Sequence, residues 1–184
     1  MVRNWYNVES EAVLLLLGRE AHLRSIAKQL SLPHSTVRRK LEFLIKENVL
    51  DCRTEGKNKI FFIKKTLQAR NYVFNAERHK LIKLLKKYKG MDVIITELLE
   101  QSNEKLIVLF GSYARFAAKP DSDIDIYILT KNKKAKQNLE ALYTKIKVKF
   151  GPFDTSSPLI REIIKNHVIL RGVEEFYDKL GFFG

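Results

Sequence analysis

Apolar residues recur at helical spacing in several segments of the first ninety residues. The patterns predict helices over 8–20 and 22–32, and a third helix from Ser35, in which apolar side chains lie at i, i+4, i+7 and i+8 from Val37. Ser35 is expected to cap that helix, because its hydroxyl can accept from the first free backbone amides. The stretch VLDCRT-EGKN-KIFFIK then predicts a β-hairpin with Gly-Lys-Asn at its tip.

The second half of the chain combines strand and helix patterns. A continuous apolar run over 105–110 predicts a buried strand. The run DIDIYIL alternates, which predicts a strand with Asp123 and Asp125 on one face. Helices are expected over 66–90, 91–101, 139–150 and 159–170. The expected class is therefore α+β, with a small mixed sheet flanked by helices in the second half.

The net charge of +13 is divided unevenly along the 184 residues. Residues 1–90 carry 20 Lys and Arg against 8 Asp and Glu, whereas residues 91–184 carry 14 against 13. A solvated, lysine-rich surface kept for solubility does not predict such a division. The asymmetry indicates a polyanion-binding part joined to a part with another task.

Composition excludes several classes of protein. The single cysteine, Cys52, excludes an internal disulfide framework and predicts a reducing, cytoplasmic environment. No apolar run approaches the roughly 18 to 20 residues that span a bilayer, and the first residues lack the pattern of a signal peptide, so no membrane association is expected. The four histidines have no metal-ligand spacing, and GxxxxGK and GxGxxG motifs are absent.

Residues 8–65 resemble the winged helix-turn-helix of bacterial and archaeal transcription regulators. The resemblance implies that double-stranded DNA is a partner, with the helix from Ser35 in a major groove and the hairpin tip on a neighbouring phosphate or in the minor groove. The side chains assigned to DNA in this way are Ser35, Thr36, Arg38, Arg39, Lys40, Lys57 and Lys59. The alternative is a winged helix used only for contacts with proteins.

The helix expected over 66–90 separates two domains, predicted over 1–65 and 91–184. Its apolar residues Leu67, Phe74, Leu81 and Tyr88 recur every seven positions. This spacing fits the seam of a homodimer, and it fits equally well a linker helix that packs on both domains.

Three aspartates lie within five residues, Asp121, Asp123 and Asp125, and the last two belong to an apolar run. Two carboxylates on one strand face raise each other's pKa unless a cation lies between them. Mg²⁺ suits such oxygen ligands, since it binds through one or two carboxylates together with substrate phosphates. Gly111 would let a phosphate approach the backbone, and Ser112 offers a hydroxyl and an amide. Arg115 would reach phosphate oxygens. These residues predict a site for Mg²⁺ with a nucleoside triphosphate.

Gly111-Ser112, ten intervening residues and then Asp123-Ile124-Asp125 resemble the signature of the DNA polymerase β-type nucleotidyltransferase superfamily. Within it, FGSYAR and SDIDI are similar to the minimal nucleotidyltransferases, known as antitoxin partners of HEPN-domain toxins. The resemblance covers residues 91–172. It implies transfer with two metal ions, held by Asp123, Asp125 and a third carboxylate on a neighbouring strand.

Asp154 is the candidate for this third carboxylate, and its alternative role is to cap a helix that begins near Pro158. A second departure from the family pattern is Phe116, where these proteins commonly carry glycine.

Three functions follow from the two resemblances, and they are not exclusive. The first is a transferase that places AMP from ATP on a hydroxyl of a protein or an RNA and binds DNA. The second is a transcription regulator whose transferase-like domain only binds nucleotide. The third is a self-regulating, antitoxin-like protein that masks a HEPN-like toxin.

Overall fold

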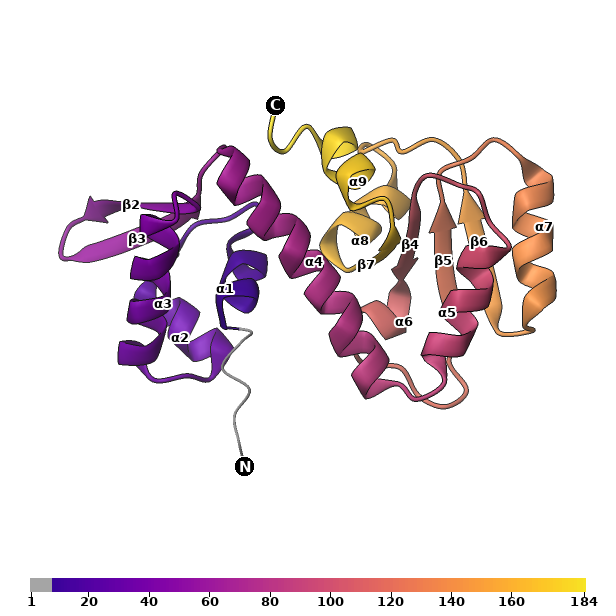
Figure 1. Cartoon of the computed structure of the whole chain (residues 1–184), viewed down its shortest axis with the longest axis horizontal. Coiled ribbons are helices and arrows are strands. Elements are labelled where there is room, and N and C mark those ends of the chain that lie inside the picture. The colour runs from indigo at the N-terminus through magenta and orange to yellow at the C-terminus, as the bar shows by residue number, and fades with distance from the viewer. Residues whose placement is uncertain (1–7) are drawn as a thin grey trace. The chain divides into compact units, whose positions relative to one another are not determined.

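The computed structural model describes residues 8–184, which form two compact units. Unit 1 takes the chain up to His79 together with Phe183–Gly184, and unit 2 is Lys80–Phe182. The division lies inside the long helix α4 (Leu67–Lys87), which Figure 1 shows as one continuous ribbon. Each unit contains both helices and strands, so the predicted α+β class is confirmed.

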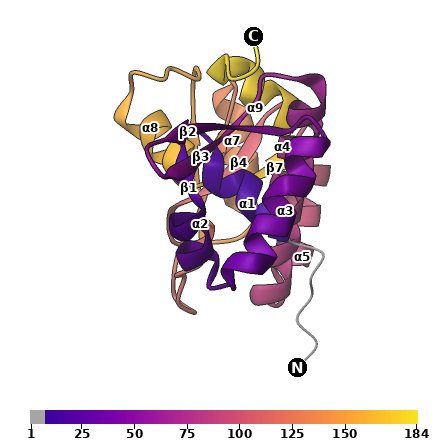
Figure 2. The ribbon, with the colours of Figure 1, turned by 90° about the vertical axis from the view of Figure 1, so that its left-hand side faces the viewer.

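Unit 1 has the predicted winged helix-turn-helix arrangement, with its helices and hairpin visible in Figure 2. Before α4 its elements are α1 (Val8–Leu16), β1 (Ala21–His22), α2 (Leu23–Leu30), α3 (His34–Lys46), β2 (Leu50–Glu55) and β3 (Asn58–Ile63). The antiparallel sheet has the strand order β1-β3-β2. Pairing of β2 with β3 ends at Glu55 and Asn58, which leaves Gly56-Lys57 as the turn. Gly56 has a φ of +60°, a conformation that glycine adopts without strain.

The core of unit 1 is built by the apolar stripes that the sequence predicts. The buried side chains on its helices α1, α2 and α3 are Val8, Ala12, Val13, Leu16, Ile26, Ala27, Val37, Leu41 and Leu44. Leu50, Ile60 and Phe61 of the sheet are also buried. These positions leave the basic residues of α3 on the outer surface, except for Lys40.

The prediction that Ser35 caps the third helix is wrong. Helix α3 begins at His34 with Pro33 at its N-cap position, where no side chain caps the helix. The amide of Val37 already donates to Pro33 O at 3.1 Å, which places Ser35 within the first turn. The fixed φ of proline, −58° here, suits a helix entry, and this determines the boundary more strongly than the serine hydroxyl does.

Unit 2 is built around a mixed sheet with the strand order β6-β5-β4-β7, in which β5 and β6 are parallel and the other pairs antiparallel. After α4 its elements are α5 (Met91–Glu100), β4 (Ile107–Phe110), α6 (Gly111–Ala114), β5 (Ile124–Ile128), α7 (Lys133–Leu142), β6 (Ile146–Phe150), α8 (Pro158–Lys165), β7 (Val168–Arg171) and α9 (Val173–Leu180). In residues 8–184 no helix is long and apolar enough to cross a membrane.

Alternation along the strands gives the sheet two different faces. Ile124, Ile126 and Ile128 of β5 point into a core that includes Met91, Ile95 and Leu98 of α5. Asp125 and Tyr127 point to the opposite face. There Tyr127 is buried against the ring of Phe153 and its hydroxyl donates to Gly151 O at 2.8 Å. The same alternation therefore builds the core and places Asp125 outside it.

Two predicted helices in the second half are partly wrong. The helix expected over 139–150 ends at Leu142, and Ile146–Phe150 forms strand β6. The helix expected over 159–170 ends at Lys165, and Val168–Arg171 forms strand β7. In both cases the last apolar residues fit a strand as well as a helix, and backbone pairing with β5 or β4 decides between them.

Candidate functional sites

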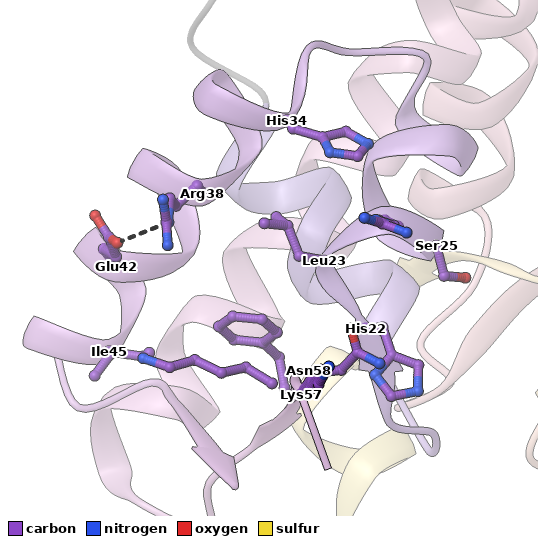
Figure 3. Close-up of a pocket in the computed structure, with 12 residues that line it drawn as sticks. His22, Leu23, Ser25, His34, Arg38, Glu42, Ile45, Lys57 and Asn58 are labelled. Carbon is purple, nitrogen blue, oxygen red and sulfur yellow. Dashed lines mark ion pairs between the residues drawn. The ribbon is translucent and has the colours of Figure 1, made fainter. Parts of the chain in front are cut away.

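A groove of about 580 Å³ lies between α3 and the β2–β3 hairpin of unit 1 (Figure 3). Its lining residues come from β1, α2, α3 and the hairpin, and they are His22, Leu23, Arg24, Ser25, His34, Arg38, Glu42, Ile45, Lys57, Asn58, Lys59 and Phe61. The cations Arg24, Arg38, Lys57 and Lys59 outnumber the single carboxylate, Glu42. A groove with this charge suits a polyanion.

The groove brings together some of the side chains that the sequence assigns to DNA. Arg38, Lys57 and Lys59 line it, whereas Ser35, Thr36 and Arg39 are not among its lining residues. Arg38 Nε lies 3.5 Å from Glu42 Oε1, and both side chains are exposed (Figure 3). An exposed pair of this kind contributes about 0 to 1 kcal/mol, so Arg38 can leave it at little cost.

Lys40 does not face the groove. Its Nζ lies 2.5 Å from Glu9 Oε1 on α1, and each side chain is only about a fifth exposed, at 21% and 20%. In this structure Lys40 ties α3 to α1, and its assignment to DNA stays a prediction. The apolar stripe on α3 does not predict the ion pair of Lys40 with Glu9, because Lys40 lies outside the stripe and Glu9 is 31 residues away in the sequence.

Sequence reasoning missed Arg24 and the two histidines of the groove. His22 pairs with Ile60 across the sheet, so short strand β1 brings His22 and Arg24 to the hairpin. A two-residue strand leaves no periodic signal in the sequence. Only the pairing of β1 with β3 reveals that this part of the chain belongs to the groove.

A second candidate site in unit 2 lies where β4 ends beside β5. Phe110, the last residue of β4, pairs with Asp125, and the next residue, Gly111, begins α6. Gly111 has a φ of +70°, and a Cβ added to it would overlap Asp125 Oδ2 and lie 3.0 Å from Asp125 Cγ. The carboxylate therefore rests against the backbone of Gly111, where only glycine leaves room for it.

Negative charge outweighs positive charge around Asp125. Burial raises the pKa of the Asp125 carboxyl, and the carboxylates of Asp123 and Glu162 raise it further. Lys149 and Arg115 act in the opposite direction, but the net shift of the pKa is upward. A cation that binds beside Asp125 would stabilise the ionised form of its carboxyl group.

Arg115 follows α6 and lies close to the acidic residues. Its guanidinium Nη1 is 3.4 Å from Glu162 Oε1 on α8, with both side chains about half exposed. Ser112 is partly exposed on α6. Glu162 was missed by the sequence reasoning, because the apolar pattern of its helix indicates packing and its polar positions carry no further signal.

Asp154 is held in its own loop. Its Oδ1 accepts from Ser156 N at 2.9 Å and from Ser156 Oγ at 2.7 Å, and these hydrogen bonds lower the pKa of the carboxyl. The cap of α8 is Ser157, whose Oγ accepts from Ile160 N at 3.2 Å, so the prediction that Asp154 caps this helix is wrong. In residues 8–184 no three His, Cys, Asp or Glu side chains form a metal-binding group, so Asp154 does not join Asp123 and Asp125.

Residues 92–175 match the family model described as Polymerase beta, Nucleotidyltransferase. The C-terminal half of the chain is a polymerase β-type nucleotidyltransferase domain. The matched range runs from α5 into α9, so the Gly111–Asp125 contact and the charged residues around it all belong to the nucleotidyltransferase domain.

No curated protein matches the chain. Among solved structures, the adhesin competence repressor of Streptococcus pyogenes is similar with a TM-score of 0.37 at 18% identity, over 50% of this chain and 73% of that chain. A toxin-antitoxin with AMP-PNP is similar with a TM-score of 0.34 at 24% identity, over 57% of this chain and 79% of that chain. Neither similarity is close enough to identify a ligand or a partner of this chain.

Phe116 has a left-handed backbone conformation, which glycine adopts without strain, at the position where similar proteins commonly carry glycine. Its φ is +56°, in the left-handed region. Its ring lies 5.7 Å from Lys83 Nζ and 5.9 Å from Lys87 Nζ, and its carbonyl oxygen accepts from Lys87. Contacts with α4 therefore offset the backbone strain of a left-handed phenylalanine. The turn after Arg115 is retained although phenylalanine stands in place of glycine.

Asp123 and Asp125 are the residues of the nucleotidyltransferase domain that could hold Mg²⁺. Asp123 and Asp125 supply carboxylate oxygens in a place with excess negative charge, and Mg²⁺ commonly binds one or two carboxylates together with phosphates. A second ion would need a further acidic ligand. The described residues 8–184 contain no group of three such side chains.

Replacing Gly111 by alanine is expected to destabilise the nucleotidyltransferase domain more than the matched change Gly90→Ala. Both positions have a left-handed φ, +70° and +84°, so both variants lose about 1 to 2 kcal/mol from backbone strain. Only the Cβ at Gly111 also displaces a carboxylate, since nothing lies within 4 Å of a Cβ at Gly90. Urea denaturation of the two variants tests this, and equal stabilities would contradict the packing of Asp125 against Gly111.

Proposed function

We propose that this chain binds double-stranded DNA through unit 1 and a nucleoside triphosphate with Mg²⁺ through its nucleotidyltransferase domain. The nucleotide is ATP, and AMP is transferred to a hydroxyl of a protein or an RNA. The observation that carries the proposal is the Asp125 carboxylate against the backbone of Gly111, with the charge of Asp123 beside it.

Each residue of the site has a task in this function. Asp123 and Asp125 hold the ion, Gly111 lets a phosphate approach the main chain, and Ser112 and Arg115 bind phosphate oxygens. Mg²⁺, when bound, offsets the charge of the triphosphate and polarises the phosphate that is attacked. The acceptor oxygen forms a bond to the α-phosphorus, the bond to the pyrophosphate oxygen breaks, and the acceptor hydroxyl loses its proton.

The test of this function uses ATP labelled at the α-phosphate, Mg²⁺ and the full chain, with protein and RNA fractions as acceptors. We expect label on an acceptor together with release of pyrophosphate, and neither with the Asp125→Asn variant. If wild-type protein binds Mg²⁺·ATP but labels no acceptor, transfer is excluded and the second candidate below stands. If wild-type protein does not bind Mg²⁺·ATP, the site is misassigned.

The second candidate is a transcription regulator whose nucleotidyltransferase domain binds the nucleotide without transferring it. The observation that favours it is the position of Asp154, which is hydrogen-bonded to Ser156 and does not form a metal-binding group with Asp123 and Asp125. Without a third carboxylate, no ligand set is complete for a metal ion on the acceptor side.

Asp154→Ala is expected to leave the affinity for Mg²⁺·ATP unchanged and to lower the melting temperature slightly. The hydrogen bonds from Ser156 lower the pKa of Asp154, so the ionised carboxylate stabilises the folded chain at neutral pH. The stabilising contribution of the carboxylate is lost as the pH falls through the lowered pKa of Asp154. The difference in melting temperature between the variant and the wild type then disappears. Melting curves from neutral to acidic pH and calorimetry with ATP measure both effects. A loss of transfer without a loss of stability would make Asp154 a catalytic residue.

DNA binding by unit 1 is supported by the groove between α3 and the hairpin. Its cations come from α2, α3 and the hairpin, which is an arrangement that can contact phosphates on both sides of an inserted helix. The charge excess of residues 1–90 adds a long-range attraction to nucleic acid.

A further inference from the structure

We propose that this chain binds a second copy of itself through one face of unit 2, where the end of α4 and the outer side of α5 lie next to each other. We call this surface the α4–α5 face. Its basic half consists of Ile82, Lys86 and Lys89, and its acidic half consists of Asp92, Val93 and Glu100. The inference is independent of the proposed function, because none of these residues belongs to either candidate site.

Two neighbouring hollows mark the α4–α5 face. One of about 410 Å³ is lined by Ile82 and the two lysines of the basic half. The other, of about 570 Å³, is lined by Val93 and Glu100 of the acidic half. Asp92 lines both hollows, so they lie side by side on one surface. The face is therefore hollowed in both halves, which gives a partner places to insert side chains.

The periods of the two helices turn these residues outward. Ile82 and Lys86 are four residues apart on α4, and Val93 and Glu100 are seven residues apart on α5. Residues at these spacings share one side of a helix. The other side of each helix packs in the core of unit 2, with Leu84 of α4 among its buried residues.

Exposed apolar side chains gather on this face. In residues 8–184, the large apolar side chains that are exposed in unit 2 are Ile82 and Val93, at 46% and 61%. One lies in each half of the α4–α5 face. A single exposed apolar residue is ordinary, whereas apolar residues that share a hollowed face with charges around them are typical of a surface that contacts protein.

The charges select a second copy as the occupant. Lys86, Lys89, Asp92 and Glu100 are exposed, and within the described residues none of them forms an ion pair. A two-fold rotation places the basic half of one copy on the acidic half of the other, and the symmetry forms the reverse contact as well. Each copy therefore supplies the opposite charges that the face of the other copy needs.

The seven-residue stripe that the sequence offers as a dimer seam lies on a different side of α4. Phe74 is buried, and Leu81 and Tyr88 pack against the core of unit 2. These side chains are used within the chain. The side of α4 that remains for a second copy is the one that carries Ile82 and Lys86.

The experiment is sedimentation equilibrium of the full chain at micromolar concentrations, with two charge-reversed variants. Both halves of the face are acidic in Lys86→Glu/Lys89→Glu. Both halves are basic in Asp92→Lys/Glu100→Lys. Each variant alone is expected to weaken self-association by about tenfold or more, because like charges then meet at both contacts. An equimolar mixture of the two variants should form a heterodimer with the affinity of the wild-type homodimer, because both of its contacts join opposite charges.

Two further variants separate the face from charge in general. Lys133→Glu/Lys134→Glu makes the same change of charge on α7, outside both hollows, and should associate as the wild type does. Val93→Ser keeps every charge and removes apolar surface, so it should weaken self-association without any reversal of charge.

Recovery of the dimer on mixing cannot arise from misfolding of either variant, so it would establish the contact between the two halves. A monomeric wild type would overturn the proposal. Wild-type association by both charge-reversed variants would overturn it as well, and would show that the copies meet through another surface. A mixture that stays monomeric would contradict the pairing of the basic half with the acidic half, and the α4–α5 face would then serve a different protein.

Discussion

The variant Asp123→Asn/Asp125→Asn is expected to lose all Mg²⁺-dependent binding of ATP. The structure places the Asp125 carboxylate against Gly111, with the charge of Asp123 acting on it, and amides of the same size cannot offset the charge of a divalent ion. Affinity in the presence of EDTA should change little or increase, because the repulsion between these carboxylates and the triphosphate is removed. Titration calorimetry with and without Mg²⁺ measures both quantities.

Asp121→Asn is the matched control for this variant. Asp121 belongs to the same acidic stretch and is exposed, but it lies in the turn before β5. The Asp121→Asn variant should bind Mg²⁺·ATP with the affinity of the wild type. If the double variant binds Mg²⁺·ATP normally, or if Asp121→Asn loses binding to the same degree, Asp123 and Asp125 are not the metal ligands.

Stability provides an independent check on Asp125. The pKa of this carboxyl is raised in the folded chain by burial and by the charges of Asp123 and Glu162, so the ionised group destabilises the fold at neutral pH. Asp125→Asn should therefore melt at a higher temperature than the wild type at pH 7 without nucleotide. The difference should vanish below the ordinary carboxyl pKa, where the group is protonated in both the folded and the unfolded chain. A lower melting temperature at pH 7 would indicate a structural role.

The centre of the candidate site in the nucleotidyltransferase domain could be predicted, because it depends on short-range patterns. Alternation along DIDIYIL is sufficient to place Asp123 and Asp125 away from the core, and a glycine at the end of an apolar strand indicates a close approach. The winged-helix core follows in the same way from the stripe on α3, and the basic hairpin tip follows from a turn that needs glycine.

The remaining features depend on contacts between distant parts of the chain. The segment Ile146–Phe150 fits both a helical and a strand period, and only its pairing with β5 makes it a strand. The ion pairs of Arg115 with Glu162 and of Lys40 with Glu9 join residues that no local period connects. The sequence therefore predicts the centre of each candidate site, and the fold is needed to show which charges surround it.

The variant Lys57→Gln/Lys59→Gln is expected to bind duplex DNA more weakly at every sequence and with a smaller dependence on salt. Both lysines are exposed on the hairpin and line the groove beside α3. Each phosphate contact that is lost lowers the slope of log affinity against log salt by about 1, so the slope should fall by about 2.

The variant Arg38→Ala is expected to lose affinity at one base pair only. Loss of a side chain that reads a base costs about 1–3 kcal/mol of binding free energy at that base pair and leaves other sequences unaffected. Fluorescence titrations with genomic fragments, starting with the promoter of this protein's own gene, measure affinity and slope.

Lys28→Gln/Lys46→Gln is the control, with the same loss of charge at exposed positions that do not line the groove. It should reduce the slope by less than the hairpin variant does, because a general attraction depends on total charge and a contact depends on position. Equal slopes for the two variants would show that the groove does not hold the duplex and that unit 1 attracts DNA only through its net charge. Wild-type affinity weaker than micromolar at low salt for every fragment would exclude DNA as the ligand. The groove between α3 and the hairpin would then be a surface for docking a protein, and its four cations would predict an acidic partner.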